Sequence, residues 1–370
     1  MKKRISALVS LALAGVLLLS SCGGTPQSAE TDPVDAPTAE AGVNPAIPAG
    51  EGPWYSGYGE PQYGGEIVFA SNRFLEKLDI YNSGYSINFF FLEPLFIPDW
   101  SVDRSEYGFT TNYIPTEYYQ GCLAESYEQP DLQTVIVHLR QDVYWQDKEP
   151  VNGRQFTASD VVYHYSRLAG IGAFQGQEPS PQCGARLTPI VSVTETDQFT
   201  VEFKFQEETP NNLSLLLDQD SYNYIMAPEV IEAGLGEDWE YAVGTGPWIL
   251  TELIPGNMVT FEKNPNYWGY DERYPENRLP YADTLKVMSV SEASTKLASL
   301  RTGQIDFADE LTLQQYEILK ESDSDLLIYQ VPFIATNGLQ INMTHKPFDD
   351  INVRKALQMA IDRETMAAQY

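Results

Sequence analysis

The chain has 370 residues, enough for about two or three domains and a large hydrophobic core. It is acidic: 23 Lys and Arg side chains against 52 Asp and Glu give a formal net charge of -29. Such a surface repels the phosphate groups of nucleic acids, and no cluster of Lys or Arg interrupts it. We therefore exclude a nucleic-acid-binding function and interpret the charge as that of a solvated surface.

The first 22 residues have the order of a secretory signal. Lys2, Lys3 and Arg4 form a basic head, and the apolar run at residues 8–19 is too short for a stable membrane span. The phrase Leu-Ser-Ser-Cys, which ends at Cys22, resembles the bacterial lipobox. That resemblance implies a lipoprotein signal peptide at residues 1–22 and a lipid anchor on Cys22. An ordinary signal peptide with an incidental cysteine is the alternative.

Residues 23–60 are rich in Pro, Ala, Gly, Ser, Thr and Glu and contain no Lys or Arg. Such a segment cannot bury enough apolar surface to fold, so we expect a disordered acidic tether. As a coil, its roughly 38 residues would span on the order of 35 Å. The folded body is therefore expected from about residue 61 onwards.

Two cysteines remain in the body, Cys122 and Cys183. In an oxidising compartment they would form a disulfide that closes a long loop and stabilises the fold by roughly 4 kcal/mol. Two buried free thiols are an equally open alternative. His138, His164 and His345 are scattered and lack the spacing of metal ligands, so we predict no metal site and no cofactor.

Hydrophobic alternation predicts several strands in the body. In the clearest one, at residues 134–140, Val135, Val137 and Leu139 share one face. A glycine pair at residues 64–65 is followed by another β-rich run. Further strands are expected at residues 191–193, 199–205, 248–253 and 285–290.

Helices are predicted from capping signals. Thr157 and Asp160 have the spacing of a capping box. A proline near the start of residues 226–231 is typical of a first helical turn, and another helix is expected at residues 294–300. The glycine-rich turn at residues 244–248 lacks the Lys-Ser/Thr pair of a phosphate loop, so no nucleotide site is expected there.

A last amphipathic helix is predicted near the C-terminal end. Asp349 or Asp350 can cap it, and we expect its apolar stripe to be buried. Asp362 offers a cap for a further helix, but the sequence stops at Tyr370 before such a helix can pack, so we expect the natural chain to continue. The stripe consists of Val353, Ala356, Leu357, Ala360 and Ile361.

The run from Pro347 to Glu364 resembles the signature of the extracellular solute-binding proteins of family 5, which serve peptide ABC importers. In that family a proline, an aromatic residue, one or two aspartates and then Val-Arg-x-Ala-Leu and Ala-Ile-Asp-Arg open the second lobe. Earlier phrases match the family in the same order, so that the resemblance spans roughly residues 63–370. They include residues 64–70, 78–80, 92–96, 122–127, 156–162, 244–248, 264–269, 279–283 and 294–306.

The resemblance implies an α/β fold. It is the two-lobed clamshell of the type 2, class C periplasmic binding proteins, with the second lobe only begun in this chain. Lobe I would be discontinuous, at residues 61–95 and 185–335, with a small accessory domain at residues 96–184. Residues 336–370 would be the truncated start of lobe III.

Two segments are insertions relative to the family pattern. Residues 100–119 are rich in Tyr, Asn and Thr. Their aromatic rings either line a ligand site or, as we favour, pack within a surface loop. Residues 152–155 are expected only to lengthen a loop.

The resemblance also implies a function. Such proteins capture a ligand between two lobes and present the closed form to a membrane transporter. We therefore expect an exported, lipid-anchored monomer, on the outer face of the cytoplasmic membrane or in the periplasm. It would deliver peptides to an ABC permease and its ATPase. Because the cleft needs both lobes, we expect this chain alone to bind ligand weakly.

Few ligand contacts can be assigned. Ser71 and Asn72 lie at the end of the first expected strand. Asn337 and Gly338 lie where the chain would cross into the second lobe. Each of the four has an alternative role as a turn or cap residue.

Other ligands and other classes of protein stay open. Relatives with this fold carry nickel chelates, sugars or opines, and the fold does not decide the ligand. A tethered sensor is a further alternative. A secreted hydrolase with paired carboxylates is a rival, but 52 acidic residues make close pairs uninformative. No nucleophile elbow, metal motif or catalytic triad is present in the sequence, so we predict that the protein is not an enzyme.

Overall fold

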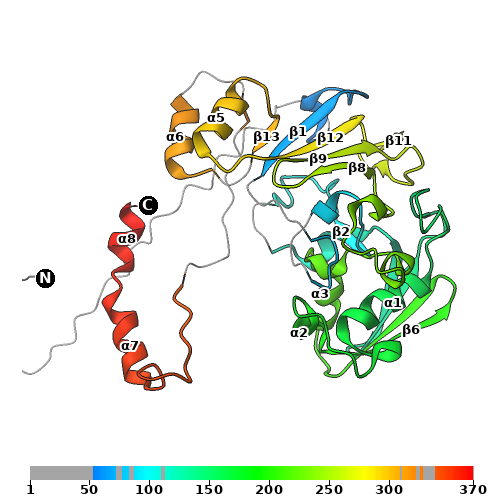
Figure 1. Cartoon of the computed structure of the whole chain (residues 1–370), viewed down its shortest axis with the longest axis horizontal. Helices are drawn as coiled ribbons and strands as arrows, with labels where there is room; N and C mark the ends of the chain where they lie inside the picture. The colour runs from blue at the N-terminus through cyan, green and yellow to red at the C-terminus, as the bar shows by residue number, and fades with distance from the viewer. Residues whose placement is uncertain are drawn as a thin grey trace, which may run out of the picture. The chain divides into compact units, whose positions relative to one another are not determined.

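The computed structural model describes residues 53–71, 77–82, 87–109, 113–308, 311–321, 326–327 and 338–369 (Figure 1). Its largest sheet has five strands in the order β13-β1-β12-β9-β8. Strand β1 pairs in parallel with β12 and β13, whereas β9 runs antiparallel to β12 and β8. The strands span Glu66–Ser71 (β1), Trp248–Ile254 (β8), Met258–Lys263 (β9), Thr284–Ser289 (β12) and Phe307–Ala308 (β13).

The chain enters this sheet through the predicted glycine pair. Gly64 and Gly65 have φ angles of 103° and 84°, which an L side chain rarely adopts. The backbone N–H of Gly64 donates to the carbonyl of Tyr281 at 2.9 Å and so aligns β1 beside β12. Three predicted strands are confirmed: the one after this glycine pair is β1, the one predicted at residues 248–253 is β8, and the one predicted at residues 285–290 is β12.

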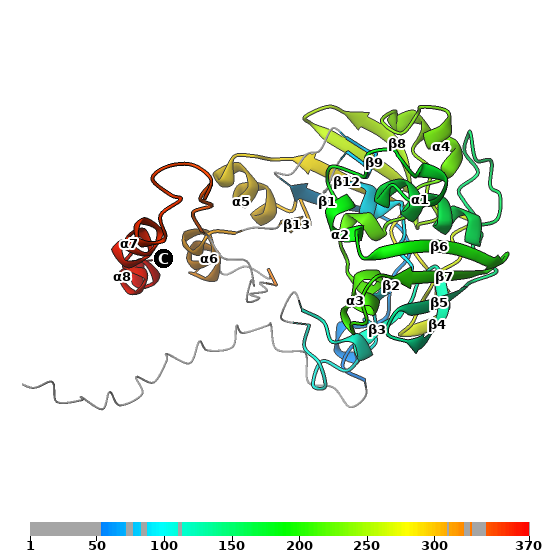
Figure 2. The same ribbon diagram turned by 90° about the horizontal axis from the view of Figure 1, so that it is seen from below.

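A second, antiparallel sheet has four strands in the order β4-β5-β7-β6 (Figure 2). Strand β5 alternates as predicted, with Val135, Val137 and Leu139 almost fully buried. Helix α1 follows the predicted capping box, because the Asp160 carboxylate accepts a hydrogen bond from the Thr157 backbone N–H at 2.9 Å. The elements are Ala124–Asp131 (β4), Thr134–Leu139 (β5), Ile190–Asp197 (β6), Thr200–Phe205 (β7) and Ala158–Ala169 (α1).

The remaining elements are short. Pro228 occupies the first turn of α4, as its missing N–H predicts. None of the described helices has the length and apolar character that a membrane crossing requires. The elements are Phe96–Pro98 (β2), Tyr119–Gly121 (β3), Tyr270–Asp271 (β10), Tyr274–Arg278 (β11), Gly184–Leu187 (α2), Asn211–Leu217 (α3), Pro228–Glu232 (α4), Ala293–Arg301 (α5) and Leu313–Glu321 (α6).

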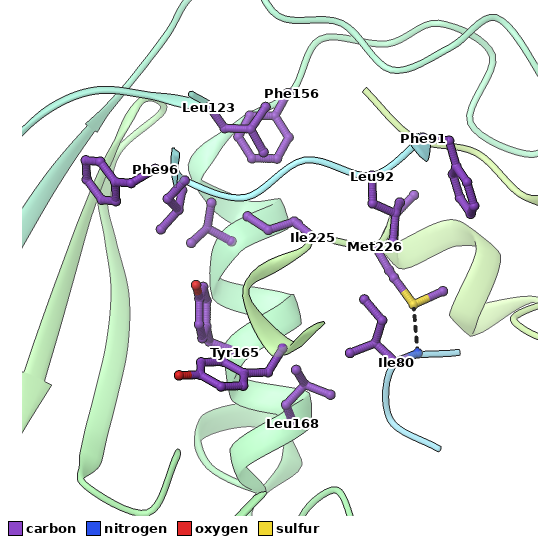
Figure 3. Close-up of a cluster of buried hydrophobic side chains, with 14 of the residues drawn as sticks. Ile80, Phe91, Leu92, Phe96, Leu123, Phe156, Tyr165, Leu168, Ile225 and Met226 are labelled. Atoms are coloured by element: carbon purple, nitrogen blue, oxygen red, sulfur yellow. Dashed lines mark hydrogen bonds between the residues drawn. The ribbon is translucent and has the colours of Figure 1, made fainter. Parts of the chain in front are cut away.

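One hydrophobic core cluster includes buried residues of both sheets, and Figure 3 shows part of it. The close-up draws Tyr165 and Leu168 of α1 in the same cluster as Ile225, and all three are at most 1% exposed. The Ile80 backbone N–H contacts the Met226 sulfur at 3.4 Å. The core therefore joins segments that the sequence assigns to lobe I and to the accessory domain.

Residues 152–155 do more than lengthen a loop, so that prediction was wrong. The Arg154 guanidinium donates to both carboxylate oxygens of Asp160 at 2.6 and 2.9 Å. It also forms a two-point ion pair with Glu229 of α4. Because its planar fork matches two carboxylates at once, the inserted arginine joins α1 to α4.

The aromatic insertion packs largely on itself, as the favoured alternative predicted. The rings of Tyr107 and Tyr118 are stacked with their centroids 4.5 Å apart. The centroid of the Phe109 ring lies 4.9 Å from that of the Trp100 ring and 4.9 Å from that of the Tyr107 ring. These described rings pack mainly against one another.

The predicted tether includes residues that are folded. Residues 53–60 contain a 3-10 turn at Ser56–Tyr58, and the side chains of Trp54 and Tyr55 are half-buried. The composition of residues 23–60 hid this, because two aromatic rings at the end of a polar segment are enough to dock it. The folded body therefore includes residues 53–60, which precede its expected start at residue 61.

The predicted C-terminal helices are present, but the expected burial of the first one is not observed. Helix α7 spans Ile351–Ala360, and its cap Asp350 accepts from the Asn352 N–H at 2.8 Å. Helix α8 spans Arg363–Gln369, with Asp362 as its cap. No residue of α7 is buried, because nothing within the described part of the chain covers its apolar stripe.

Candidate functional site

Three parallel strands end at one edge of the large sheet. Ser71 of β1 lies opposite Ser289 of β12, and Ala70 lies opposite Ala308 of β13. Ligands of open α/β sheets bind outside the carboxyl ends of their parallel strands, where consecutive loops diverge. We call these strand ends, Ser71, Ser289 and Ala308, the carboxyl edge.

Ser71 is the predicted ligand contact that the structure places at this edge. It is 6% exposed, and its carbonyl oxygen accepts a hydrogen bond from the Val290 N–H at 3.2 Å. The predicted contacts Asn72 and Asn337 lie outside the described residues. Gly338 is exposed, and an added Cβ would meet no atom within 4 Å. The described residues therefore do not bring Gly338 together with Ser71.

A carboxylate that the sequence reasoning missed follows the carboxyl edge. Glu292 caps α5 and accepts hydrogen bonds from the Thr295 backbone N–H at 2.8 Å and from the Thr295 hydroxyl at 3.1 Å. A hydrogen bond from the Ser294 hydroxyl is the main cause that lowers the pKa of Glu292. Glu292 therefore places a negative charge just after the end of β12, between β12 and α5.

A second polar cluster surrounds the buried carboxyl group of Glu93. Tyr267 donates its hydroxyl to Oε1 at 2.7 Å, and the Trp268 indole N–H donates to Oε2 at 3.0 Å. Burial raises the pKa of Glu93, and these two hydrogen bonds oppose that rise. Arg140 stacks on Trp268 with its guanidinium carbon 4.8 Å from the ring centroid. Glu93 and Tyr267 are buried, whereas Trp268 and Arg140 are half-buried, so this cluster joins distant chain segments around a buried carboxyl group.

The two body cysteines are free and buried, so the disulfide alternative is wrong for this structure. The Cys122 thiol lies 3.7 Å from the Glu93 carboxylate, whereas the Cys183 thiol contacts the Ser180 hydroxyl at 3.2 Å. Each thiol is therefore held in a different environment. Burial raises the pKa of both, which disfavours the reactive thiolate.

Among the residues that the structure describes, no group of three or more His, Cys, Asp or Glu side chains is arranged to hold a metal ion. His138 bonds to Glu128 on the outside of the second sheet. His164 is buried and bonds to the Tyr222 carbonyl at 2.8 Å. These two imidazoles thus serve separate local contacts.

Known proteins resemble the chain over most of its length. The family model of the bacterial extracellular solute-binding proteins, family 5 middle, matches residues 119–370. The periplasmic oligopeptide-binding protein OppA of Haemophilus influenzae is 26% identical over 260 residues. That alignment covers 66% of this chain and 45% of the relative, so the chain spans less than half of that protein's length.

Solved structures show the same fold. Haemophilus influenzae OppA in complex with RPPGFSPFR has a TM-score of 0.61 and 22% identity, covering 84% of this chain and 58% of that one. NikZ of Campylobacter jejuni in complex with Ni(L-His) has a TM-score of 0.58 and 19% identity, covering 81% and 54%. Both likenesses confirm the predicted α/β fold of two-domain periplasmic binding proteins. Because the family model matches more than half of the chain, the protein belongs to the bacterial extracellular solute-binding proteins of family 5.

Proposed function

We propose that this chain provides the first lobe and the accessory domain of an exported binding protein that captures peptides and delivers them to an ABC permease and its ATPase. The observation that carries the proposal is the carboxyl edge of β1, β12 and β13, a row of parallel strand ends in a member of this family. Strand ends of this kind offer backbone groups that can hydrogen-bond an extended peptide without reading its side chains.

The domain boundaries and the anchor belong to the same proposal. Lobe I would comprise residues 61–95 and 185–335, extended by residues 53–60, and the accessory domain residues 96–184. Residues 336–370 would begin the other lobe. A lipid on Cys22 would hold the monomer at the membrane, since an acylated cysteine supplies the chains needed for stable anchoring. The protein would act by binding alone, as the named relatives are binding proteins.

Isothermal titration of the protein expressed from its complete natural reading frame tests the proposal. A mixed pool of short peptides should bind with a Kd of about 1 μM or tighter. Ser71→Ala should weaken that binding about fivefold or more, because it removes a polar group at the carboxyl edge. Ser166→Ala, which removes an equally buried hydroxyl within α1, should leave the affinity unchanged.

Nickel chelates are a second ligand class that a specific observation favours, namely the likeness to NikZ in complex with Ni(L-His). The same titration with Ni²⁺ and histidine, with a sugar and with an opine separates these ligands from peptides. Tight binding of one of them, with none of the peptide pool, would overturn the peptide assignment and keep the binding function. Turnover of any of these compounds would overturn the binding function itself.

A further inference from the structure

Residues 53–63 lie on an aromatic surface built by two distant segments. The first is the aromatic insertion, and the second is the hairpin of β10 and β11. The Trp54 indole N–H donates to the Ser101 carbonyl at 3.3 Å. The Tyr55 ring meets the Tyr274 ring edge-on with the centroids 5.5 Å apart. We call this surface the aromatic platform; it comprises Ser101, Arg104, Phe109, Tyr274, Arg278 and Tyr281.

Arg104 lies between the insertion and the N-terminal segment. Its guanidinium carbon is 4.1 Å from the centroid of the Trp54 ring and 4.6 Å from that of Phe109. The loop orients it, because Nη1 donates to the Val102 carbonyl at 3.0 Å and Nη2 to the Trp100 carbonyl at 3.1 Å. With its edge held by two carbonyls, the planar cation presents its faces to the two rings.

The hairpin holds the other end of the same segment. The Tyr63 hydroxyl donates to the Arg278 carbonyl at 2.9 Å, and the Tyr63 ring lies 5.0 Å from that of Tyr281. The Tyr274 hydroxyl donates to the Gly59 carbonyl at 3.4 Å. The segment is therefore fixed at Trp54, at Gly59 and at Tyr63, by partners far away in the sequence.

These contacts support the packing role over the ligand-lining role for the aromatic insertion. Rings that line a ligand site would leave their faces open, whereas Phe109 shares the Arg104 cation with Trp54. The platform is thus already occupied by a segment of the same chain.

We propose that the aromatic platform is a clamp that fixes the point at which the predicted N-terminal tether leaves the folded body. A tether that starts at a fixed point restricts the orientations in which an anchored body faces the membrane. If residues 53–63 were not held, the tether would stay free up to residue 63 and would be about 10 residues longer. The clamp itself rests only on the contacts above, and its orienting role rests on the proposed lipid anchor.

Hydrogen–deuterium exchange of the purified protein tests the clamp. Arg104→Ala and Trp54→Ala should each speed exchange of the peptide at residues 53–63 by about tenfold or more. Arg104→Lys, which keeps the charge but loses the planar stack, should give an intermediate rate. Arg301→Ala, an exposed arginine in α5, is the matched control and should change nothing. Unchanged exchange in α1 would show that each variant is folded.

Equal exchange of residues 53–63 in the wild type, Arg104→Ala and Trp54→Ala would overturn the clamp. Its orienting role is tested on the lipidated protein in phosphatidylcholine vesicles, by energy transfer from a dye on Thr194→Cys to a labelled lipid. Arg104→Ala should broaden the distance distribution, and an unchanged distribution would overturn the orienting role. If mass spectrometry finds no lipid on Cys22, the proposed anchor fails, while the exchange result still decides the clamp.

Discussion

Asp79 and Arg167 form a two-point ion pair, with Nη1 to Oδ1 at 2.9 Å and Nη2 to Oδ2 at 2.6 Å. Asp79 follows the first strand of the large sheet, whereas Arg167 belongs to α1 on the second sheet. The Tyr81 ring covers the guanidinium at 4.7 Å. Only 9% of the Asp79 side chain and 16% of the Arg167 side chain are exposed, so this pair joins the segment after β1 to α1 where little water screens it.

Removing one partner of this pair should be costly. Asp79→Asn or Arg167→Gln should each lower the free energy of unfolding by about 2–3 kcal/mol, because the remaining charge stays largely buried. The double variant should lose less than the sum of the two. Urea denaturation measures all three, with Lys263→Gln as the control, since Lys263 pairs with Asp283 on the exposed surface and should cost under about 1 kcal/mol. Strict additivity would show that the pair is not coupled.

His164 should make the fold sensitive to acid. Burial lowers its pKa to about 4, from 6.5 for a free imidazole. As the pH falls from 6.5 to 4, the unfolded chain takes up a proton that the folded chain does not, so the free energy of unfolding decreases by about 3 kcal/mol at most.

His164→Gln tests this dependence. The amide can replace the bond to the Tyr222 carbonyl but cannot titrate, so the variant should lose less stability than the wild type between pH 7 and pH 4. Urea midpoints at several pH values measure the difference. Parallel curves for the wild type and His164→Gln would contradict the prediction.

Glu93 should show the opposite sign. Burial raises its pKa, so the folded chain binds a proton more readily than the unfolded chain, and this contribution to stability decreases as the pH rises above about 4.5. Glu93→Gln leaves one acceptor for the two donors Tyr267 and Trp268, and should cost about 1–3 kcal/mol. Tyr267→Phe removes one donor and should cost less. Denaturation of both at pH 5 and pH 8 tests this order.

Local patterns in the sequence predicted the elements that depend on neighbouring residues. The alternation of Val135, Val137 and Leu139 is enough to define β5, and the Thr157–Asp160 spacing is enough to start α1. The carboxyl edge was predicted only in part: the end of β1 at Ser71 follows from the strand pattern, but its pairing with Ser289 does not. Parallel pairing joins residues far apart in the chain, and a single sequence carries no signal for it.

The features that were missed depend on distant partners. Arg154 looked like a loop residue because Glu229, its second carboxylate, lies 75 residues away in the sequence. Glu93 stood within a matched phrase, yet its donors lie in another phrase more than 170 residues later. Trp54 was assigned to the tether from the composition of its segment, because its partner Arg104 lies far along the chain. Composition describes a segment by itself, whereas docking depends on the surface that it meets.

The close approach of two backbone segments gives the sharpest test of packing. A Cβ added to Gly244 would lie 1.8 Å from the Phe91 carbonyl oxygen, which is backbone and cannot move aside alone. Gly244→Ala should therefore separate the 244–248 turn from the Phe91 segment and lower the free energy of unfolding by about 3 kcal/mol or more. Gly338→Ala is the matched control, because its Cβ would meet nothing within 4 Å and should change stability little. Similar urea midpoints for the two variants would mean that the turn can shift away from Phe91 at little cost.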